Sequence, residues 1–126
     1  MLSSQSPDGI REILIVEDDF AARTLLAELL ESRDYSVATA ADGRQALDYL
    51  RISSPPKVII LDLMMPVMDG WEFLEHQAHD PALTNIPIVV LSATESPQPM
   101  KVNAILQKPV QVDAFVELVE QFLPHS

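Results

Sequence analysis

The chain has 126 residues, 48% of them apolar and none cysteine, which allows one domain with a buried core and excludes disulfides and thiolate metal sites. Nineteen acidic and eight basic residues give a formal net charge of −11, which argues against direct binding to nucleic acid or to anionic lipid. The sequence has no apolar run near the ~18 residues of a membrane span and no signal-peptide pattern at residues 1–9, so we expect a cytoplasmic protein.

Strand and helix patterns alternate along the chain. Continuous β-branched and apolar runs are typical of strands buried on both faces, and apolar residues recurring every three or four positions indicate amphipathic helices. In chain order these patterns predict a strand at 13–16, a helix at 20–33, a strand at 35–40, a helix around 46–50, a strand at 58–63, a helix from 70, strands at 88–91 and 104–106, and a helix at about 112–122. Such alternation predicts a parallel sheet with helices on both faces.

The connection between the fourth and fifth strands, residues 93–103, breaks the alternation. Pro97 and Pro99 lack backbone N–H donors, and they disfavour helical geometry at the residues before them. The residues that remain before the next strand suffice for about one helical turn. We therefore expect the helix between these strands to be missing or reduced to about one turn.

Polar residues stand where the predicted strands end. They are Glu17, Asp18 and Asp19 after the first strand, Asp62 at the end of the third, Ser92 at the end of the fourth and Lys108 after the fifth. The carboxyl ends of parallel strands share one edge of the sheet, where clustered carboxylates require a cation, and hard oxygen ligands with open positions suit Mg²⁺. Aspartate can itself accept a phosphoryl group, with lysine and serine as donors to the transferred oxygens. A single acidic residue at a strand end is usually only solvated, but the coincidence of four strand ends favours a site.

Four segments in order carry a resemblance to a known family. They read ILIVEDD at 13–19, LDLMMPVMDG at 61–70, LSA at 91–93 and QKP at 107–109. Together they resemble the receiver domain of bacterial two-component response regulators, of the stand-alone type. The resemblance implies an α/β, doubly wound, flavodoxin-like sheet of five parallel strands in the order 2-1-3-4-5. It places the receiver domain at 10–123, with a flexible N-terminal tail at 1–9 and a C-terminal tail at 124–126.

The resemblance also implies metal-binding roles. Asp62 would be the phosphoacceptor and, with Asp18, a direct ligand of Mg²⁺. Glu17 would bind the ion through water, and Met64 would offer its backbone carbonyl. Asp19 matches a variable position of the family and is left out of the site.

Further roles follow for the other strand ends. Lys108 would pair with the phosphoryl group, the Lys108–Pro109 peptide bond would be cis, and Ser92 would move toward the phosphate. Met64 and Thr94 would tune its lifetime. The donor would be a sensor histidine kinase or a histidine phosphotransfer protein, and the reader a separate downstream protein. The resemblance thus implies a switch that would catalyse its own phosphorylation and dephosphorylation rather than an enzyme acting on other substrates.

Two departures from the family affect its usual signalling face. Receivers usually have a full helix between the fourth and fifth strands, and an aromatic residue three positions before the lysine, where this chain has Ile105. Ordinary strand packing explains Ile105 equally well. We hypothesise that loss of the helix uncovers an apolar part of the sheet and that another chain covers it. One version of this hypothesis is a homodimer, in which a second copy of the chain is the cover.

Two other functions stay open. A pseudo-receiver would keep the fold as an interaction module that phosphate does not regulate; the lost helix favours it, and the four strand-end residues argue against it. A small aspartate-nucleophile phosphatase is the third reading, but its DxD pattern is lacking because Met64 stands two residues after Asp62.

Overall fold

The computed structural model describes residues 11–94 and 100–123 of the chain. The tails expected at 1–9 and 124–126, and the prolines at 97 and 99, lie outside these ranges. In chain order the elements are β1 (Ile13–Val16), α1 (Phe20–Glu31), β2 (Val37–Ala40), α2 (Gly43–Ile52), β3 (Val58–Asp62), α3 (Gly70–Ala78), β4 (Ile88–Ser92), β5 (Ala104–Gln107) and α4 (Val112–Glu120). The alternation predicted from the sequence is confirmed, with element ends shifted by a few residues.

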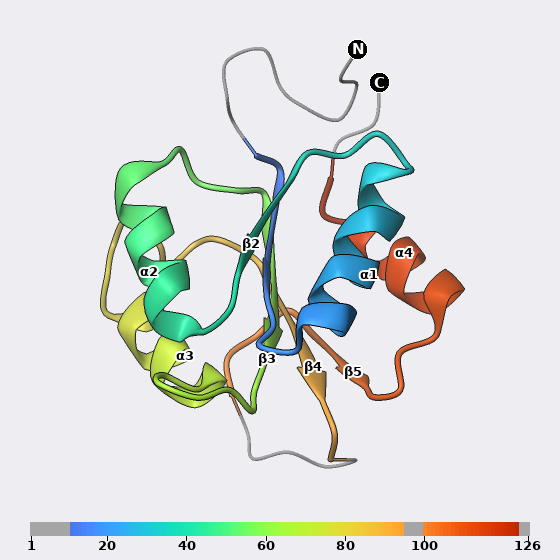
Figure 1. The fold of residues 1–126 in the computed structure, drawn as a ribbon. Helices are drawn as coiled ribbons and strands as arrows, with labels where there is room; N and C mark the ends of the chain where they lie inside the picture. The colour runs from blue at the N-terminus through green and yellow to red at the C-terminus, as the bar shows by residue number, and fades with distance from the viewer. Residues whose placement is uncertain (1–10, 95–99, 124–126) are drawn as a thin grey trace.

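The five strands form one parallel sheet in the order β2-β1-β3-β4-β5, as predicted. Helices α1 and α4 cover one face, which we call the α1/α4 face, and α2 and α3 cover the other, the α2/α3 face (Figure 1). Since both faces are covered, every residue of β1 and β3 is buried. Side chains alternate between the faces, so Ile13 and Ile15 pack on the α1/α4 face and Leu14 and Val16 on the α2/α3 face.

Aspartates begin three of the helices. The side chains of Asp19, Asp42 and Asp69 accept hydrogen bonds from backbone N–H groups in the first turns of α1, α2 and α3. These caps satisfy donors that the helix itself leaves unpaired. They fix where each chain segment turns back from the carboxyl end of a strand, which is where the polar residues gather.

The β4–β5 connection has no helix in its described part, residues 93–94 and 100–103. On β5, Ile105 is paired with Val90 and faces the α2/α3 side, yet it is 43% exposed. Leu106 faces the other way and packs against the α1/α4 core. The expectation of a missing helix therefore holds for the described residues, and among them only the α1/α4 face of β5 is covered.

None of the helices in the described ranges is long and apolar enough to span a bilayer; α1, with 12 residues, falls well short of the required ~20.

Candidate functional site

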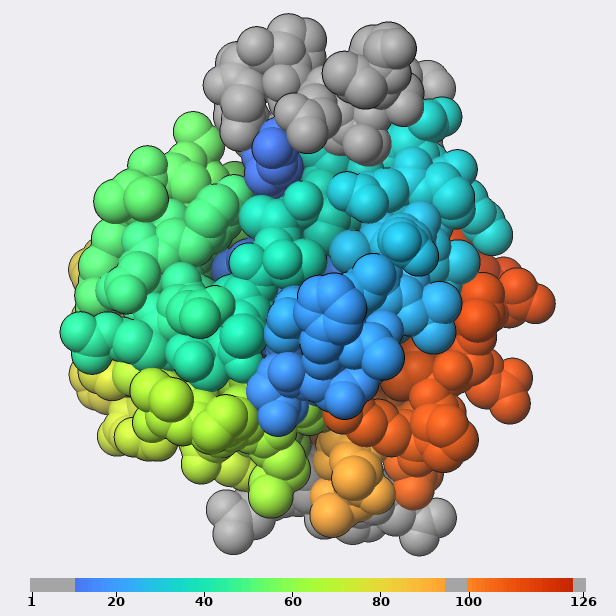
Figure 2. Space-filling view, viewed as in Figure 1, coloured from blue at the N-terminus to red at the C-terminus, as the bar shows by residue number. Residues whose placement is uncertain are grey.

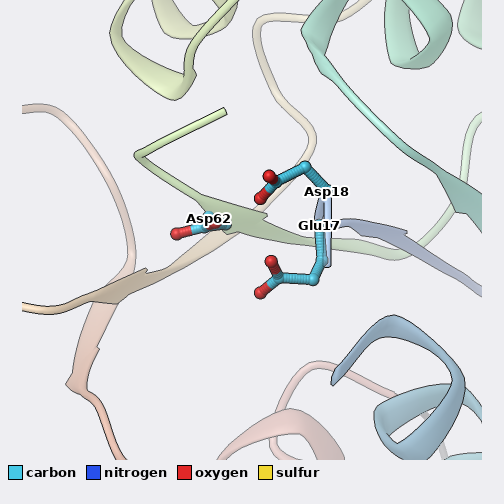
Figure 3. Close-up of side chains that lie close together, drawn as sticks. All are labelled: Glu17, Asp18 and Asp62. Carbon is cyan, nitrogen blue, oxygen red and sulfur yellow. The ribbon is translucent and has the colours of Figure 1, made fainter. Parts of the chain in front are cut away.

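Three carboxylates meet at the carboxyl ends of β1 and β3. Glu17 and Asp18 follow the last residue of β1, and Asp62 is the last residue of the neighbouring β3. One oxygen from each carboxylate lies within 4.8 Å of the others. Figure 3 shows the three side chains extending from the ends of the two strands. Glu17 and Asp62 are only 2% and 3% exposed, whereas Asp18 faces solvent.

Lys108 joins this cluster from the end of β5, the edge strand that lies two places from β3 in the sheet. Its Nζ lies 3.3 Å from Glu17 Oε1 and 3.2 Å from Asp62 Oδ1, across 91 and 46 residues of sequence. Its backbone N–H donates to the carbonyl oxygen of Ser92 at 2.7 Å, and the Lys108–Pro109 bond is cis, as predicted. The cluster thus has three carboxylates opposite one ammonium group.

The electrostatics reflect this crowding. Burial raises the pKa of Glu17, and the charge of Asp62 adds to the rise, while a hydrogen bond from the Asp19 N–H and the nearby Lys108 oppose it. Burial alone would lower the pKa of Lys108, but the hydrogen bond and charge of Asp62, with Glu17, outweigh burial and raise it. The raised pKa means that Lys108 is held as a cation beside Asp62 and Glu17.

Ser92 lies at the end of β4, next to the strand that carries Asp62, and it is buried. Its Oγ accepts a hydrogen bond from the Thr94 N–H at 3.1 Å and lies 3.0 Å from Thr94 Oγ1. The hydroxyl is thus held by Thr94. Contact with a group on Asp62 would require Ser92 to exchange these bonds.

The segment after Asp62 is packed tightly against β3. The Gly70 N–H donates to the Leu63 carbonyl at 2.9 Å. A Cβ at Gly70 would lie 2.7 Å from the Asp62 carbonyl oxygen and from Leu63 Cα, so this position needs glycine. The spacing from Asp62 to Gly70 seen in the sequence therefore has a packing reason: α3 begins directly against the end of β3.

Residues 13–120 match the family described as "Response regulator receiver domain". The chain belongs to this family. A curated relative of the receiver, "Two-component response regulator ORR3" of Oryza sativa subsp. indica, is 33% identical over 97 residues, which cover 77% of this chain and 74% of the relative. "Polar-differentiation response regulator DivK" of Brucella anthropi is 27% identical over 119 residues, covering 90% and 96%.

Solved structures agree with this receiver fold. The chemotaxis response regulator CheY4 of Vibrio cholerae superposes with a TM-score of 0.81 at 29% identity, covering 90% of this chain and 99% of that one. The phosphorylated cyanobacterial phytochrome response regulator RcpA gives 0.74 at 32% identity, covering 89% and 90%. Some relatives are longer: the chain spans 35% of the transcriptional regulatory protein SphR of Synechococcus elongatus, at 37% identity.

The receiver's acidic cluster fits a hard divalent cation. It offers one carboxylate oxygen from each of three residues, two of them buried and one, Asp18, open to solvent. Mg²⁺ prefers this kind of partial oxygen set, because it keeps several of its waters. The Met64 N–H lies 3.4 Å from Asp62 Oδ1 and its side chain is exposed. Its carbonyl as a metal ligand stays a prediction.

One residue that contacts the strand-end cluster was not predicted from the sequence. Arg23, in α1, donates from Nη1 to the backbone carbonyls of Glu17 at 2.8 Å and Asp18 at 3.2 Å. Its position offered a signal, because helical side chains point toward the helix N-terminus and Arg23 lies one turn after Asp19. The Asp19 carboxylate caps α1 through the Ala22 N–H at 2.8 Å.

Proposed function

We propose that the chain is a phosphoacceptor switch in which Asp62 takes a phosphoryl group from a histidine kinase or a histidine phosphotransfer protein. The observation that supports this most is the environment of Asp62: a buried carboxylate at a strand end, with Lys108 Nζ at 3.2 Å and two further acidic side chains within metal-binding distance. Few structural roles would collect three carboxylates and one lysine at one sheet edge, because buried like charges repel.

In the proposed transfer, an Asp62 carboxylate oxygen attacks phosphorus in line and forms the O–P bond, while the N–P bond of the phosphohistidine breaks and its electron pair returns to the imidazole. Glu17, Asp18 and Asp62 would hold Mg²⁺, which supplies charge neutralisation for the transferred oxygens. Lys108, already beside Asp62, would neutralise the same charge from the other side. Attack of water on the aspartyl phosphate returns Asp62 and inorganic phosphate.

The signal would arise from Ser92 and Lys108. A phosphoryl group adds about two negative charges and strong acceptor oxygens next to both side chains. Ser92 would give up its bonds to Thr94 and donate to the phosphate, which moves the start of the β4–β5 connection. Residues 100–103 of this connection border the α2/α3 face beside β5, where Ile105 is exposed, and we propose that a separate downstream protein reads this surface.

Intact-mass spectrometry after incubation with acetyl phosphate and Mg²⁺ tests the chemistry. We expect a gain of ~80 Da that requires Mg²⁺ and is absent in Asp62→Asn. Asp48→Asn is the matched control, because Asp48 is an exposed aspartate on α2 in a surface ion pair, and it should be phosphorylated like the wild type.

Other results would redirect the proposal. Mg²⁺ binding without mass gain calls for the same assay with a phosphorylated histidine kinase, and a second negative result there would refute the phosphoacceptor function. Absence of both phosphorylation and Mg²⁺ binding would favour the pseudo-receiver. Sedimentation of the phosphorylated and unphosphorylated chain tests the homodimer: a monomer at high concentration in both states would eliminate self-association as the cover of the β5 face.

A further inference from the structure

The Arg23 side chain binds the backbone of the acidic pair Glu17 and Asp18. The guanidinium bonds to the carbonyls of Glu17 and Asp18, which lie in the turn between β1 and α1. The first backbone hydrogen bond of α1 uses the next carbonyl along the chain, that of Asp19, which accepts from the Arg23 N–H at 2.9 Å. The Arg23 side chain therefore serves two carbonyl acceptors that precede the helix, which fixes the direction of both peptide units.

Phe20 in turn supports the guanidinium. It is a large aromatic residue that is 71% exposed at the start of α1, and the Arg23 guanidinium carbon lies 5.5 Å from the centre of its ring. Cation–π contact at this distance is attractive and favours a flat guanidinium over the ring. In Figure 2 the first turn of α1 (blue) lies on the surface, between α2 and α4, so the stack is not explained by core packing.

The two acidic side chains differ in how they are held. The Glu17 carboxylate accepts from the Asp19 N–H at 3.1 Å and pairs with Lys108, so its own contacts orient it. In the described ranges no hydrogen bond or ion pair fixes the Asp18 carboxylate, which is exposed. The direction of the Asp18 side chain therefore depends on its backbone, and Arg23 holds that backbone.

We propose that Arg23, steadied by Phe20, is a positioning residue that presets the Glu17–Asp18 pair for a divalent cation. The inference rests on the proposed function, since Mg²⁺ is the cation that phosphorylation of Asp62 would require. Arg23 touches neither the ion nor the reacting atoms; it acts through the two carbonyls. Supporting contacts of this kind typically change metal affinity by about 10–100-fold when they are removed.

The sign of the effect separates positioning from simple electrostatics. Arg23 is a cation close to a cation site, so Coulomb's law alone predicts that its removal tightens Mg²⁺ binding. Positioning predicts the opposite, because a loose turn no longer presents both carboxylates to one ion. The two accounts therefore differ in direction and not only in size.

Isothermal titration of the full chain with MgCl₂ at constant ionic strength is the test. We expect Arg23→Ala to raise the Mg²⁺ Kd by about 10-fold. Arg23→Lys should fall between Arg23→Ala and the wild type, because an ammonium lacks the planar fork that serves two carbonyls and stacks on a ring. Phe20→Leu should raise the Kd by a smaller factor, about 2- to 4-fold.

Arg44→Ala is the matched control, since it removes an arginine from the first turn of α2 whose one ion pair within the described residues is with Asp48, on the surface at 3.6 Å. It should leave the Mg²⁺ Kd unchanged or slightly lower. A second readout uses the metal-free chain: amide hydrogen exchange at Asp19 and Ala22 should speed up in Arg23→Ala, while exchange in β3 stays unchanged. A merely structural role for Arg23 would lower overall stability without this local pattern.

An unchanged or tighter Mg²⁺ Kd in Arg23→Ala would overturn the positioning role, as would a wild-type chain that binds no Mg²⁺. Should Arg23→Ala fail to fold, Arg23→Lys and Phe20→Leu decide the question by the same criterion. Failure of the proposed function is a separate result: a chain that binds Mg²⁺ but is never phosphorylated still shows whether Arg23 sets the affinity. With phosphorylation present, the rate at saturating Mg²⁺ should stay within about 2-fold of wild type in Arg23→Ala, and only the Mg²⁺ concentration for half-maximal rate should rise.

Discussion

The two faces of the sheet are covered to different extents. We call the α1/α4 face the closed face and the α2/α3 face the open face. On the α1/α4 face the core continues across all five strands, and on β5 both Ala104 and Leu106 pack against it. On the α2/α3 face the buried core ends at β4, and a pocket of about 410 Å³ lies between α3 and residues 100–103. Ile105 and Gln107 are the β5 residues on this side, and both are exposed.

The strand-end residues and the exposed side of β5 depend on different features of the fold. The strand-end residues Asp62, Ser92 and Lys108 depend on the carboxyl ends of the strands, which the sheet order alone brings together. The described residues of the β4–β5 connection, 93–94 and 100–103, contain no helix, yet that edge is intact, because β5 still pairs in register with β4. Among the described residues the difference is confined to how β5 is covered on one face. The proposed phosphorylation site and the proposed partner surface therefore depend on different parts of the receiver fold.

The largest expected effect compares one fully buried phenylalanine from each face. Phe115 on α4 and Phe73 on α3 are both completely buried. Replacement by alanine should cost about 3–5 kcal/mol in each case, and more for Phe115→Ala, because the closed face has less freedom to collapse around the cavity. Urea unfolding of both variants measures this. A larger cost for Phe73→Ala would show that the open face is the more rigid of the two.

Gly70→Ala tests whether α3 itself is held loosely on the open face. Alanine usually stabilises a helix relative to glycine. At position 70, however, its Cβ would lie 2.7 Å from backbone atoms of Asp62 and Leu63. We expect a loss of about 1–3 kcal/mol in the free energy of unfolding. Ala21→Gly, at an exposed site in the first turn of α1, gives the size of the propensity effect alone. Stabilisation by Gly70→Ala would mean that α3 can move away from β3.

The sequence predicted the fold because each face leaves a periodic signal. The apolar runs of β1 and β3 required cover on both sides, and the prolines at 97 and 99 predicted that the β4–β5 connection would lack a full helix, which holds for its described residues. The sheet order then placed Lys108 near Asp62. The bonds of Arg23 to two carbonyls and of Thr94 to Ser92 were not predicted, since they depend on side-chain rotamers, which leave no periodic pattern.

Tyr35 links the segment before β2 to α4 on the closed face, and its contribution to stability should depend on pH. Its hydroxyl donates to the Glu120 carboxylate of α4 at 3.2 Å, and burial first, then Glu120, raises the pKa of Tyr35 from 10.0 to about 12. Because the folded state holds this proton more tightly, the contribution to stability is complete below pH 10 and is lost as the pH rises toward 12. Tyr35→Phe should lower stability at pH 7 by about 1 kcal/mol and flatten the decline at high pH.

Tyr49→Phe is the control for this effect, because Tyr49 packs on the α2/α3 face. It should keep the wild-type decline in stability at high pH. A Tyr35→Phe variant that loses stability in parallel with the wild type over this range would show that other groups cause the decline.

The smallest expected effect compares neighbours on β5 that face opposite sides. Ile105→Thr removes apolar surface that is already exposed and should cost at most about 0.5 kcal/mol, whereas Leu106→Thr should cost about 1–2 kcal/mol, because Leu106 packs in the α1/α4 core. Threonine is β-branched and suits a strand at both positions, so the difference measures cover rather than propensity.

Unfolding at low and high protein concentration makes the comparison stricter. A cost for Ile105→Thr that grows with concentration would mean that a second copy covers the open face, since association stabilises only the form that it binds. A small cost at every concentration leaves this face of β5 free in the unphosphorylated chain, as a separate downstream partner would require.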